Sequence, residues 1–471
     1  MKKISFYFYL FITIVILNSC QQNEIKNIAI FYTNDEHGWM EANNDFGGAA
    51  GLVNLWNNEK FKSDSVLIIS GGDMWTGPAI STWYGGESMV EVMNNMGYSV
   101  AAIGNHEFDV KEKGLRQRAE ELNFPLIAAN FIEKDSRQIP SYAKPYIIKE
   151  INGVKVGIIG LASISTPHTT SPINVLQYEF TDYVEAINRY APIVKREADF
   201  VIIIAHICED EMIELAKTAK KHGIKLIGGG HCHERVLKTV DDVLLMESGS
   251  GMRNYVKVEL EFNKTSKSLK IKNKEIIENK KAELDSTTLK IIEKWKSKIT
   301  GALSEEIGYC SKRIEKRSTE MQNMVIDSWL FNFSDADVAI NNSTSIRQDI
   351  DSGIVKLETI VGLLPFDNMI YKLDILGKDL IEISTKFMIG GMTTIGSYTL
   401  SNGKPIYADS TYTILTTDYL YSVESTNLSK YDSIPENTYI NYRQTTIDWI
   451  KSLKTTKENP LNNYLDNKVR N

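Results

Sequence analysis

The stretch "VAAIGNHEFD" (residues 100–109) joins a short apolar run to a dense group of polar side chains. The apolar part has the length and composition of a buried strand. Burying an amide, an imidazole and carboxylates costs several kcal/mol unless partners satisfy them. We therefore expect Asn105, His106 and Asp109 to belong to a site that other segments of the chain complete.

Short apolar runs rich in Val and Ile recur from residue 27 to about 262. They include "SVLIIS" (65–70), "DFVIIIA" (199–205) and "IKLIGGG" (224–230), each of a length typical of strands buried on both faces. Between the runs lie amphipathic stretches such as "ESMVEVMNNMG" (87–97), whose apolar residues recur at helical spacing. This alternation predicts an α/β domain with helices packed over a sheet.

Several of these strand-like runs end in polar residues of metal-binding type, and in an open α/β sheet such ends converge. The chain has seven histidines, and five of them lie in these stretches, which chance would not produce. Imidazole and carboxylate ligands suit zinc, manganese, iron or similar ions. The candidate ligands are Asp35 and His37 in "TNDEHG" (33–38), Asp73 in "GGD" (71–73), Asn105, His206, and His231 and His233 in "GHCH" (230–233).

Seven ligands are more than one tetrahedral ion needs, but they suit two divalent ions that share a bridging carboxylate. Such pairs, about 3.5–4 Å apart, clamp the attacking and leaving oxygens of a phosphoryl displacement. A metal-bound water that loses its proton near neutral pH would be the nucleophile. A histidine free of metal could protonate the leaving group, with a carboxylate fixing its tautomer.

The order "DEH", "GGD", "GNHE", "AH", "GHCH" resembles the calcineurin-like metallophosphoesterases. The fuller "TNDEHG" and "GNHEFD", with a second domain behind them, resemble the bacterial 5'-nucleotidase family from about residue 27 to 440. The resemblance implies an α/β fold, with an N-terminal β-sandwich flanked by helices and a smaller mixed α+β C-terminal domain. Taken alone, each motif could also hold helix caps or satisfied core polar groups.

The resemblance also implies a role for each residue. One metal would be held by Asp35, His37 and His233, and a second by Asn105, His206 and His231, with Asp73 bridging them. His106 would be the free general acid, oriented by Asp109. Glu107 would be a neighbour of the ligands, and we expect His168 and His222, which match no motif, on the surface.

Residues 263–303 are lysine-rich at first and then place Leu289, Ile292, Trp295 and Ile299 at helical spacing. We expect this segment to be a connector that ends in a long helix. It would separate a catalytic domain (27–262) from a substrate-binding domain (304–463).

The stretch from 341 to 380 resembles the C-terminal domain of the nucleotidase family. The resemblance implies that Arg347, Phe366 and Asn368 line the nucleoside pocket, and that Arg313 and Arg317 are further substrate-binding arginines. The alternatives are a core phenylalanine and solvated salt bridges. The glycine-rich base-stacking loop of the family is missing, because "TTDYLYSVESTNLSKY" (416–431) contains no glycine. Three tyrosines could replace its ring, namely Tyr419, Tyr421 and Tyr431.

The first twenty residues place two lysines before an apolar stretch that ends in "LNSC". This layout is typical of a secretory signal and resembles a lipobox, which would lipidate Cys20 and anchor the exported protein to a membrane facing the periplasm or cell surface. Simple secretion is the alternative. The pairing of Cys208, Cys232 and Cys310 cannot be deduced from the sequence.

The formal net charge is −7, and no long basic block precedes residue 263, so a nucleic-acid polymer is not the expected partner. Single nucleotides are not excluded. The leading prediction is an exported, lipid-anchored, two-metal phosphohydrolase that acts on nucleotides. The alternatives are the same centre used on another phosphate ester or a nucleotide sugar, and a non-catalytic binding lipoprotein.

Overall fold

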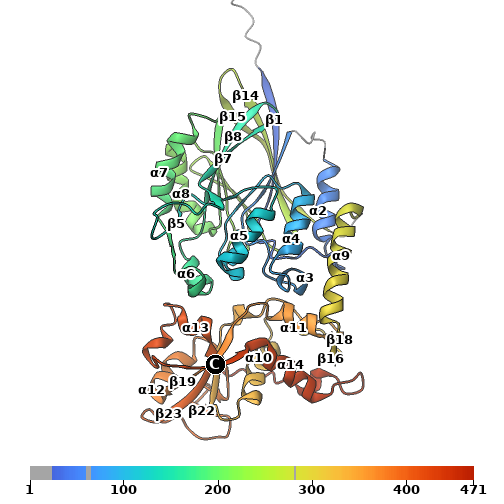
Figure 1. Ribbon diagram of the computed structural model, residues 1–471, viewed down its shortest axis with the longest axis vertical. Coiled ribbons are helices and arrows are strands. Elements are labelled where there is room, and N and C mark those ends of the chain that lie inside the picture. Colours follow the sequence, from blue (N-terminus) through green and yellow to red (C-terminus); the bar gives the residue numbers. More distant parts are fainter. Residues whose placement is uncertain (1–23, 60–64, 281–282) are drawn as a thin grey trace, which may run out of the picture.

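The computed structural model describes residues 24–59, 65–280 and 283–471, and it shows two domains stacked along the long axis of the molecule (Figure 1). The predicted signal segment, residues 1–20, lies outside the described residues. Within the described ranges, none of the helices combines the length and the hydropathy needed to span a bilayer.

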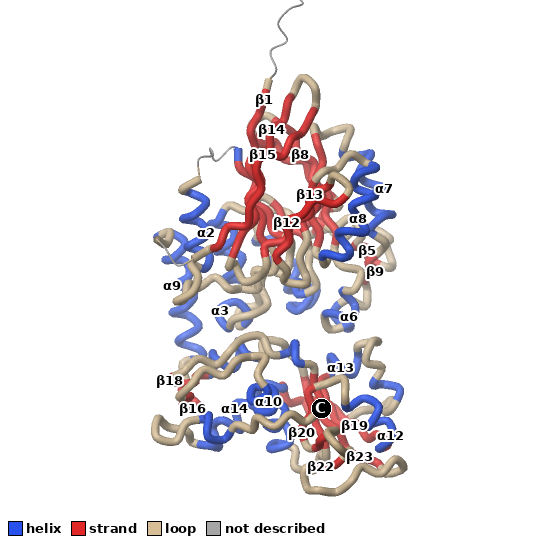
Figure 2. Tube along the Cα trace, turned by 180° about the vertical axis from the view of Figure 1, so that it is seen from behind, coloured by secondary structure: helices blue, strands red, loops and turns tan. Residues whose placement is uncertain are grey.

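The first domain is a sandwich of two mixed sheets, seen from behind in Figure 2. Parallel pairs predominate in each sheet, and antiparallel strands form one margin of the seven-stranded sheet and both margins of the six-stranded sheet. The seven-stranded sheet has the order β15 (Ser268–Glu278), β14 (Asn254–Asn263), β1 (Ile25–Thr33), β2 (Val66–Ser70), β3 (Val100–Ala102), β4 (Leu126–Ile127) and β6 (Ala143–Lys144). The six-stranded sheet has the order β12 (Arg235–Val240), β13 (Val243–Ser248), β11 (Leu226–Gly228), β10 (Phe200–Ala205), β8 (Val154–Leu161) and β7 (Tyr146–Ile151).

Both faces of β1 are buried, which explains its continuous apolar run. Ile28 and Ile30 point into the core between the sheets, while Ala29 and Phe31 pack against helices on the outer face. The methionines of "ESMVEVMNNMG" are buried in that outer core. The predicted sandwich flanked by helices is therefore confirmed. The helices over the seven-stranded sheet are α2 (Gly48–Asn57), α4 (Glu87–Met96) and α5 (Lys111–Glu121), and those over the other sheet are α7 (Tyr183–Val194) and α8 (Glu209–Lys221).

The lysine-rich start of the expected connector is instead part of the first domain. It forms β15, which pairs antiparallel with β14 at the edge of the seven-stranded sheet. Leu269 packs into the core, whereas Lys270 is exposed, so a strand at the margin of the sandwich tolerates a polar sequence. The predicted long helix is α9 (Ser286–Leu303), with Trp295 buried against the first domain.

The second domain has a five-stranded sheet whose one face packs on α10 and α14. Only the β17–β23 pair is parallel among the ladders of this sheet, which gives the smaller mixed α+β domain that was predicted. Its strands are, in spatial order, β20 (Met388–Gly390), β17 (Val338–Asn341), β23 (Thr411–Thr417), β19 (Met369–Leu376) and β24 (Glu436–Asn441), and its helices include α10 (Thr319–Asn332), α11 (Leu357–Leu363), α13 (Asp418–Ser422) and α14 (Tyr442–Leu453).

Candidate active site

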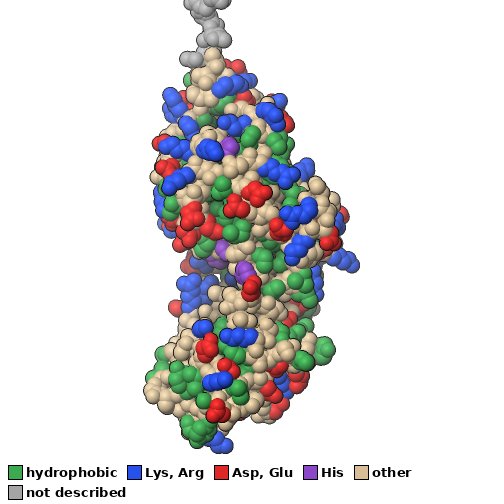
Figure 3. All heavy atoms as spheres, turned by 90° about the vertical axis from the view of Figure 1, so that its left-hand side faces the viewer, with side chains coloured by type: hydrophobic (Ala, Val, Ile, Leu, Met, Phe, Trp, Pro, Cys, Tyr) green, Lys and Arg blue, Asp and Glu red, His purple; other side chains and the backbone are tan. Residues whose placement is uncertain are grey.

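The predicted site residues lie on loops that follow strand ends of both sheets. Loops after β1, β2 and β3 bring Asp35, His37, Asp73 and Asn105, and loops after β10 and β11 bring the remaining histidines. All five segments meet at the end of the sandwich that faces the second domain, and Figure 3 shows histidine side chains at the waist between the domains. The convergence expected from the sequence is present.

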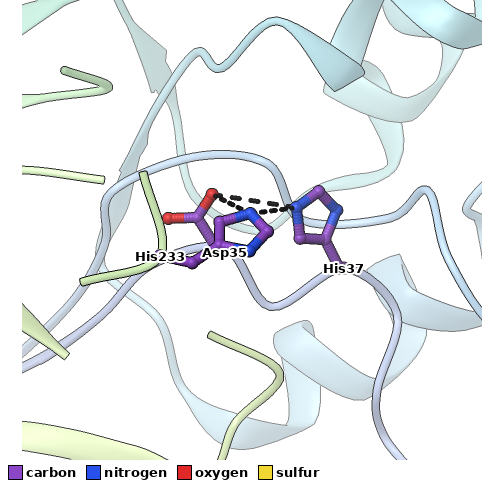
Figure 4. A group of neighbouring side chains, drawn as sticks. All are labelled: Asp35, His37 and His233. Carbon is purple, nitrogen blue, oxygen red and sulfur yellow. Dashed lines mark hydrogen bonds and ion pairs between the residues drawn. The ribbon is translucent and has the colours of Figure 1, made fainter. Parts of the chain in front are cut away.

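One cluster consists of Asp35, His37 and His233 (Figure 4). Oδ1 of Asp35 lies 3.7 Å from Nε2 of His37 and 3.3 Å from Nε2 of His233. The two ring nitrogens are themselves 3.1 Å apart. Three donor atoms therefore face a common point, although they come from loops almost 200 residues apart in sequence.

A second cluster consists of Asp73, His206 and His231. Oδ2 of Asp73 lies 3.0 Å from Nε2 of His206 and 3.8 Å from Nε2 of His37, so this carboxylate stands between the two clusters. Oδ1 of Asn105 lies 2.9 Å from Nδ1 of His231, which adds an amide oxygen to the second cluster. This arrangement matches a pair of ions with a shared carboxylate.

The donor set fits divalent cations. Oδ1 of Asp35 and Nε2 of His206 are buried, and each faces another candidate ligand atom, Nε2 of His233 and Oδ2 of Asp73 respectively. Nδ1 of His206 lies 2.9 Å from the carbonyl oxygen of Gly71, and Nδ1 of His37 lies 2.9 Å from that of Thr76. In each ring Nδ1–H can therefore donate to a carbonyl, which leaves Nε2 as the ligand atom.

The electrostatics of the site also favour positive charge. Burial raises the pKa of Asp35, but His233 and His206 outweigh it and lower that pKa to about 2. Burial lowers the pKa of His206, but Asp73 and Asp35 outweigh it and raise that pKa to about 10. Asp35 is thus ionised, and the carboxylates stabilise positive charge beside them.

The backbone of the site is strained. Five of the seven candidate ligands have φ angles between 47° and 75°, in the left-handed region that side chains other than glycine seldom adopt. Such conformations persist only where the surrounding structure imposes them, and they concentrate at functional sites. These residues are Asp35, His37, Asp73, His231 and His233.

Glu107 is buried and fixes two of the ligand loops. Its Oε2 accepts from the backbone N–H groups of Asp73 (2.8 Å) and Gly104 (2.7 Å), and its Oε1 accepts from that of Met74 (2.8 Å). It is a neighbour of the ligands, as expected, and ties the loop after β2 to the loop after β3.

His106 belongs to neither candidate ligand cluster and pairs with Asp109 instead. Nδ1 of His106 lies 2.7 Å from Oδ2 of Asp109. Burial lowers the pKa of His106, but the carboxylates of Asp109 and Asp73 outweigh it and raise the pKa above its ordinary value. A protonated imidazole held in this way can donate a proton.

A cavity of about 1370 Å³ lies between the domains, with members of both clusters on one wall. On the other wall, Nη2 of Arg347 lies 3.1 Å from Nε2 of His37. The ring of Phe366 stacks on that of His106, with a centroid distance of 5.5 Å and an interplanar angle of 22°. Arg317 and Asn368 also line the cavity.

Arg313 is not among the residues that line the cavity. Its exposed side chain is paired with Asp349 and faces Asp351 at 3.8 Å, which is the solvated salt bridge weighed as its alternative. Lys316, between the two expected arginines, lines the cavity, as does Tyr419. The hydroxyl of Tyr421 instead donates to the carbonyl of Asp432.

Other cavity residues carried no motif that sequence reasoning could have used; they include Trp83, Asp418 and Arg443. Of the two histidines without a motif, His168 is exposed, and His222 is half-buried beside Asn188. Cys208 and Cys232 form a disulfide that joins the loop after His206 to the one between His231 and His233.

The chain resembles known proteins in both of its domains. The calcineurin-like phosphoesterase model matches residues 28–235, and the 5'-nucleotidase C-terminal domain model matches residues 300–386. The 5'-nucleotidase of Vibrio cholerae is 25% identical over 89% of this chain and 87% of its own length. The trifunctional nucleotide phosphoesterase protein YfkN of Bacillus subtilis is 24% identical over 76% of this chain, which spans only 27% of that longer protein.

Among solved structures, the 5'-nucleotidase precursor of Thermus thermophilus superposes with a TM-score of 0.82 at 18% identity, over 94% of this chain and 98% of that one. At that identity the likeness establishes the shared two-domain fold. The two domain matches, in this order along one chain, account for both halves of the molecule. The chain therefore consists of a calcineurin-like phosphoesterase domain followed by a 5'-nucleotidase C-terminal domain, and it is similar over most of its length to known 5'-nucleotidases.

Proposed function

We propose that this protein removes phosphate from nucleotides, with two divalent ions such as zinc or manganese, outside the cytoplasm. One observation carries the proposal. The His106–Asp109 pair lies beside two groups of potential metal ligands and faces Arg347 and Phe366 of the second domain across one cavity. Hydrolytic and recognition groups thus share a single space.

Asp35, His37 and His233 would hold one ion, and Asn105, His206 and His231 the other, with Asp73 shared. When bound, the ions supply an activated water and neutralise charge on the phosphate. Nδ1–H of His106 donates to Asp109, which leaves Nε2 free to protonate the leaving alkoxide.

The second domain would bind the rest of the substrate. The guanidinium of Arg347 is suited to pair with phosphate oxygens, and the ring of Phe366 is suited to stack on a base. Arg317 and Asn368, also on the cavity wall, would contribute further polar contacts. Because these groups lie on a separate domain, its closure would control binding and release.

A second candidate substrate class is a larger phosphate ester such as a nucleotide sugar. Two observations favour it. The cavity of about 1370 Å³ exceeds the ~300–1,000 Å³ typical of small-molecule sites. The segment 416–431 contains no glycine and so lacks the glycine-rich base-stacking loop. A binding protein without catalysis is disfavoured, because it would have no use for a complete ligand set with a His–Asp pair.

Export and anchoring through Cys20 form part of the proposal and rest on the sequence of residues 1–20. The test is fractionation of cells that express the full chain. We expect the protein in the membrane fraction and the Cys20→Ser variant released from it. A cytoplasmic wild-type protein would contradict export.

The activity is tested with purified protein and added Mn²⁺ or Zn²⁺ on AMP, UMP, ATP, UDP-glucose, 2',3'-cyclic AMP and p-nitrophenyl phosphate. We expect release of phosphate from AMP at a higher kcat/KM than from p-nitrophenyl phosphate. Preference for UDP-glucose would favour the second substrate class. No turnover of any of them with metal bound would favour the binding protein.

A further inference from the structure

The short helix α6 (Thr166–Thr169) contacts both domains beside the candidate active site. It follows β8 and is held by its own turns, because the N–H of Thr166 donates to the carbonyl of Ser163 (3.2 Å) and that of Thr170 to the carbonyl of Thr166 (3.1 Å). Thr166 and Thr170 are buried. The segment is therefore anchored in the first domain at its two ends.

Three consecutive residues of this segment each make one contact outside it. The carbonyl of His168 accepts from the hydroxyl of Tyr419 in the second domain (3.0 Å). The carbonyl of Thr169 accepts from the amide of Asn105 (3.0 Å), and the hydroxyl of Thr170 donates to Oδ1 of Asp109 (2.9 Å).

Two of these contacts orient groups of the proposed chemistry. An amide can ligate a metal only through its oxygen, so its NH₂ group must face an acceptor, and the carbonyl of Thr169 is that acceptor. Oδ1 of Asn105 then points to His231. Thr170 holds one oxygen of Asp109 while the other accepts from His106, so the carboxylate cannot rotate without losing a bond.

The third contact crosses the domain boundary. Tyr419 lies in α13, where the N–H of Leu420 donates to the hydroxyl of Thr417 and that of Tyr419 to Asp418. Its ring lines the same cavity as Thr169 and Thr170. Because residues 168–170 share one turn, a shift at the carbonyl of His168 is passed to the next two residues.

We infer that residues 168–170 are a positioning segment, which couples docking of the second domain at Tyr419 to the orientation of Asn105 and Asp109. The inference rests on the proposed function and goes beyond it. The second domain would not only bind substrate but would also complete the alignment of the acid on closing.

The test for Thr170 is the Thr170→Val variant, which keeps the shape of the side chain and removes its hydroxyl. We expect kcat for AMP to fall about 10-fold or more, as for other groups that orient reactive residues. With p-nitrophenyl phosphate the fall should be no more than about 3-fold, because p-nitrophenolate leaves with little protonation. Metal content by mass spectrometry should not change. Thr181→Val, whose hydroxyl donates to the carbonyl of Asn130 (3.4 Å), is the matched control.

The test for Tyr419 is the Tyr419→Phe variant, with Tyr421→Phe in the same helix as control. Loss of one hydrogen bond should lower kcat for AMP about 2- to 10-fold. Amide hydrogen exchange over residues 163–170 should quicken in Tyr419→Phe and not in Tyr421→Phe. In the Thr170→Val/Tyr419→Phe double variant, the combined loss should be smaller than the product of the two.

The coupling would be overturned by equal slowing of both substrates in Thr170→Val, by losses that multiply in the double variant, or by unchanged exchange in Tyr419→Phe. These outcomes differ from failure of the proposed function, in which the metal-loaded wild type would hydrolyse neither substrate. The exchange measurement needs no turnover and tests the cross-domain contact in either case.

Discussion

Asn105 and His106 are neighbours in sequence, but their side chains face different partners. The amide oxygen of Asn105 points to His231, whereas the ring of His106 turns to Asp109. The backbone N–H of His106 donates to Oδ1 of Asp73 (2.8 Å), which fixes the backbone between the two side chains. One short motif therefore supplies a candidate ligand and a candidate acid.

His106→Ala should leave metal content near that of the wild type and lower kcat for AMP. General acid catalysis supplies about 10²–10⁴-fold, which sets the expected loss. The loss should be smaller with p-nitrophenyl phosphate. Turnover and metal analysis check both points, and His222→Ala, whose ring contacts Asn188 and does not line the cavity, is the control. Release of an ion from His106→Ala would mean that this residue is a ligand.

Asp73→Ala should lose at least one of two ions, whereas His37→Ala should lose at most one. Asp73 lies between the two clusters, and a shared carboxylate offsets the repulsion between two dications. Metal stoichiometry after gel filtration measures the difference. Retention of both ions by Asp73→Ala would rule out the shared position.

At the scale of elements, the turn between α11 and β19, which carries Phe366 and Asp367, is bound by two residues at the start of α14. Nδ2 of Asn441 donates to Oδ1 of Asp367 (3.0 Å), and the guanidinium of Arg443 donates to the carbonyls of Pro365 and Phe366. The start of α14 thus holds the turn from outside. The ring of Phe366 consequently remains directed into the cavity.

Phe366→Ala should raise KM for AMP and leave p-nitrophenyl phosphate nearly unaffected, because that ester has no base to stack. Stacking is worth about 1–3 kcal/mol, which corresponds to about 5- to 150-fold in KM. Steady-state kinetics with both substrates measures the ratio, and Phe331→Ala, on the surface of α10, is the control. Equal effects on both substrates would show that Phe366 does not bind a base.

At the scale of the whole molecule, two divalent ions would join loops from two sheets, so their binding should stabilise the first domain. At 100 times Kd, binding adds about 2.7 kcal/mol for a single site. Thermal unfolding with Mn²⁺ and with EDTA measures this difference, and we expect a higher Tm with Mn²⁺. The Asp35→Asn/Asp73→Asn variant should respond little to Mn²⁺. An equal response in that variant would place the stabilising ion elsewhere.

The sequence predicted which segments form the site better than it predicted where the first domain ends. Motifs at strand ends were informative because a His or Asp directly after a buried strand must itself be buried and needs a partner. Asp35 and His206 could therefore be recognised as candidate site residues. The strand β15 was missed because an edge strand exposes one face and reads as a polar linker. The contacts of Tyr419, Arg313 and the Cys208–Cys232 disulfide depend on how distant segments meet, and local pattern carries no signal for that.

The left-handed backbone of five candidate ligands has an evolutionary consequence. Each such conformation costs about 1–2 kcal/mol for a residue that carries a Cβ atom, and glycine adopts it without that cost. A variant library sorted for thermal stability in the presence of a chelator should therefore enrich glycine at these five positions, Asp35, His37, Asp73, His231 and His233. Selection for stability alone would erode the site at the same residues that selection for activity must preserve. A lineage released from the need for its reaction would lose these side chains first and keep the sandwich that presented them.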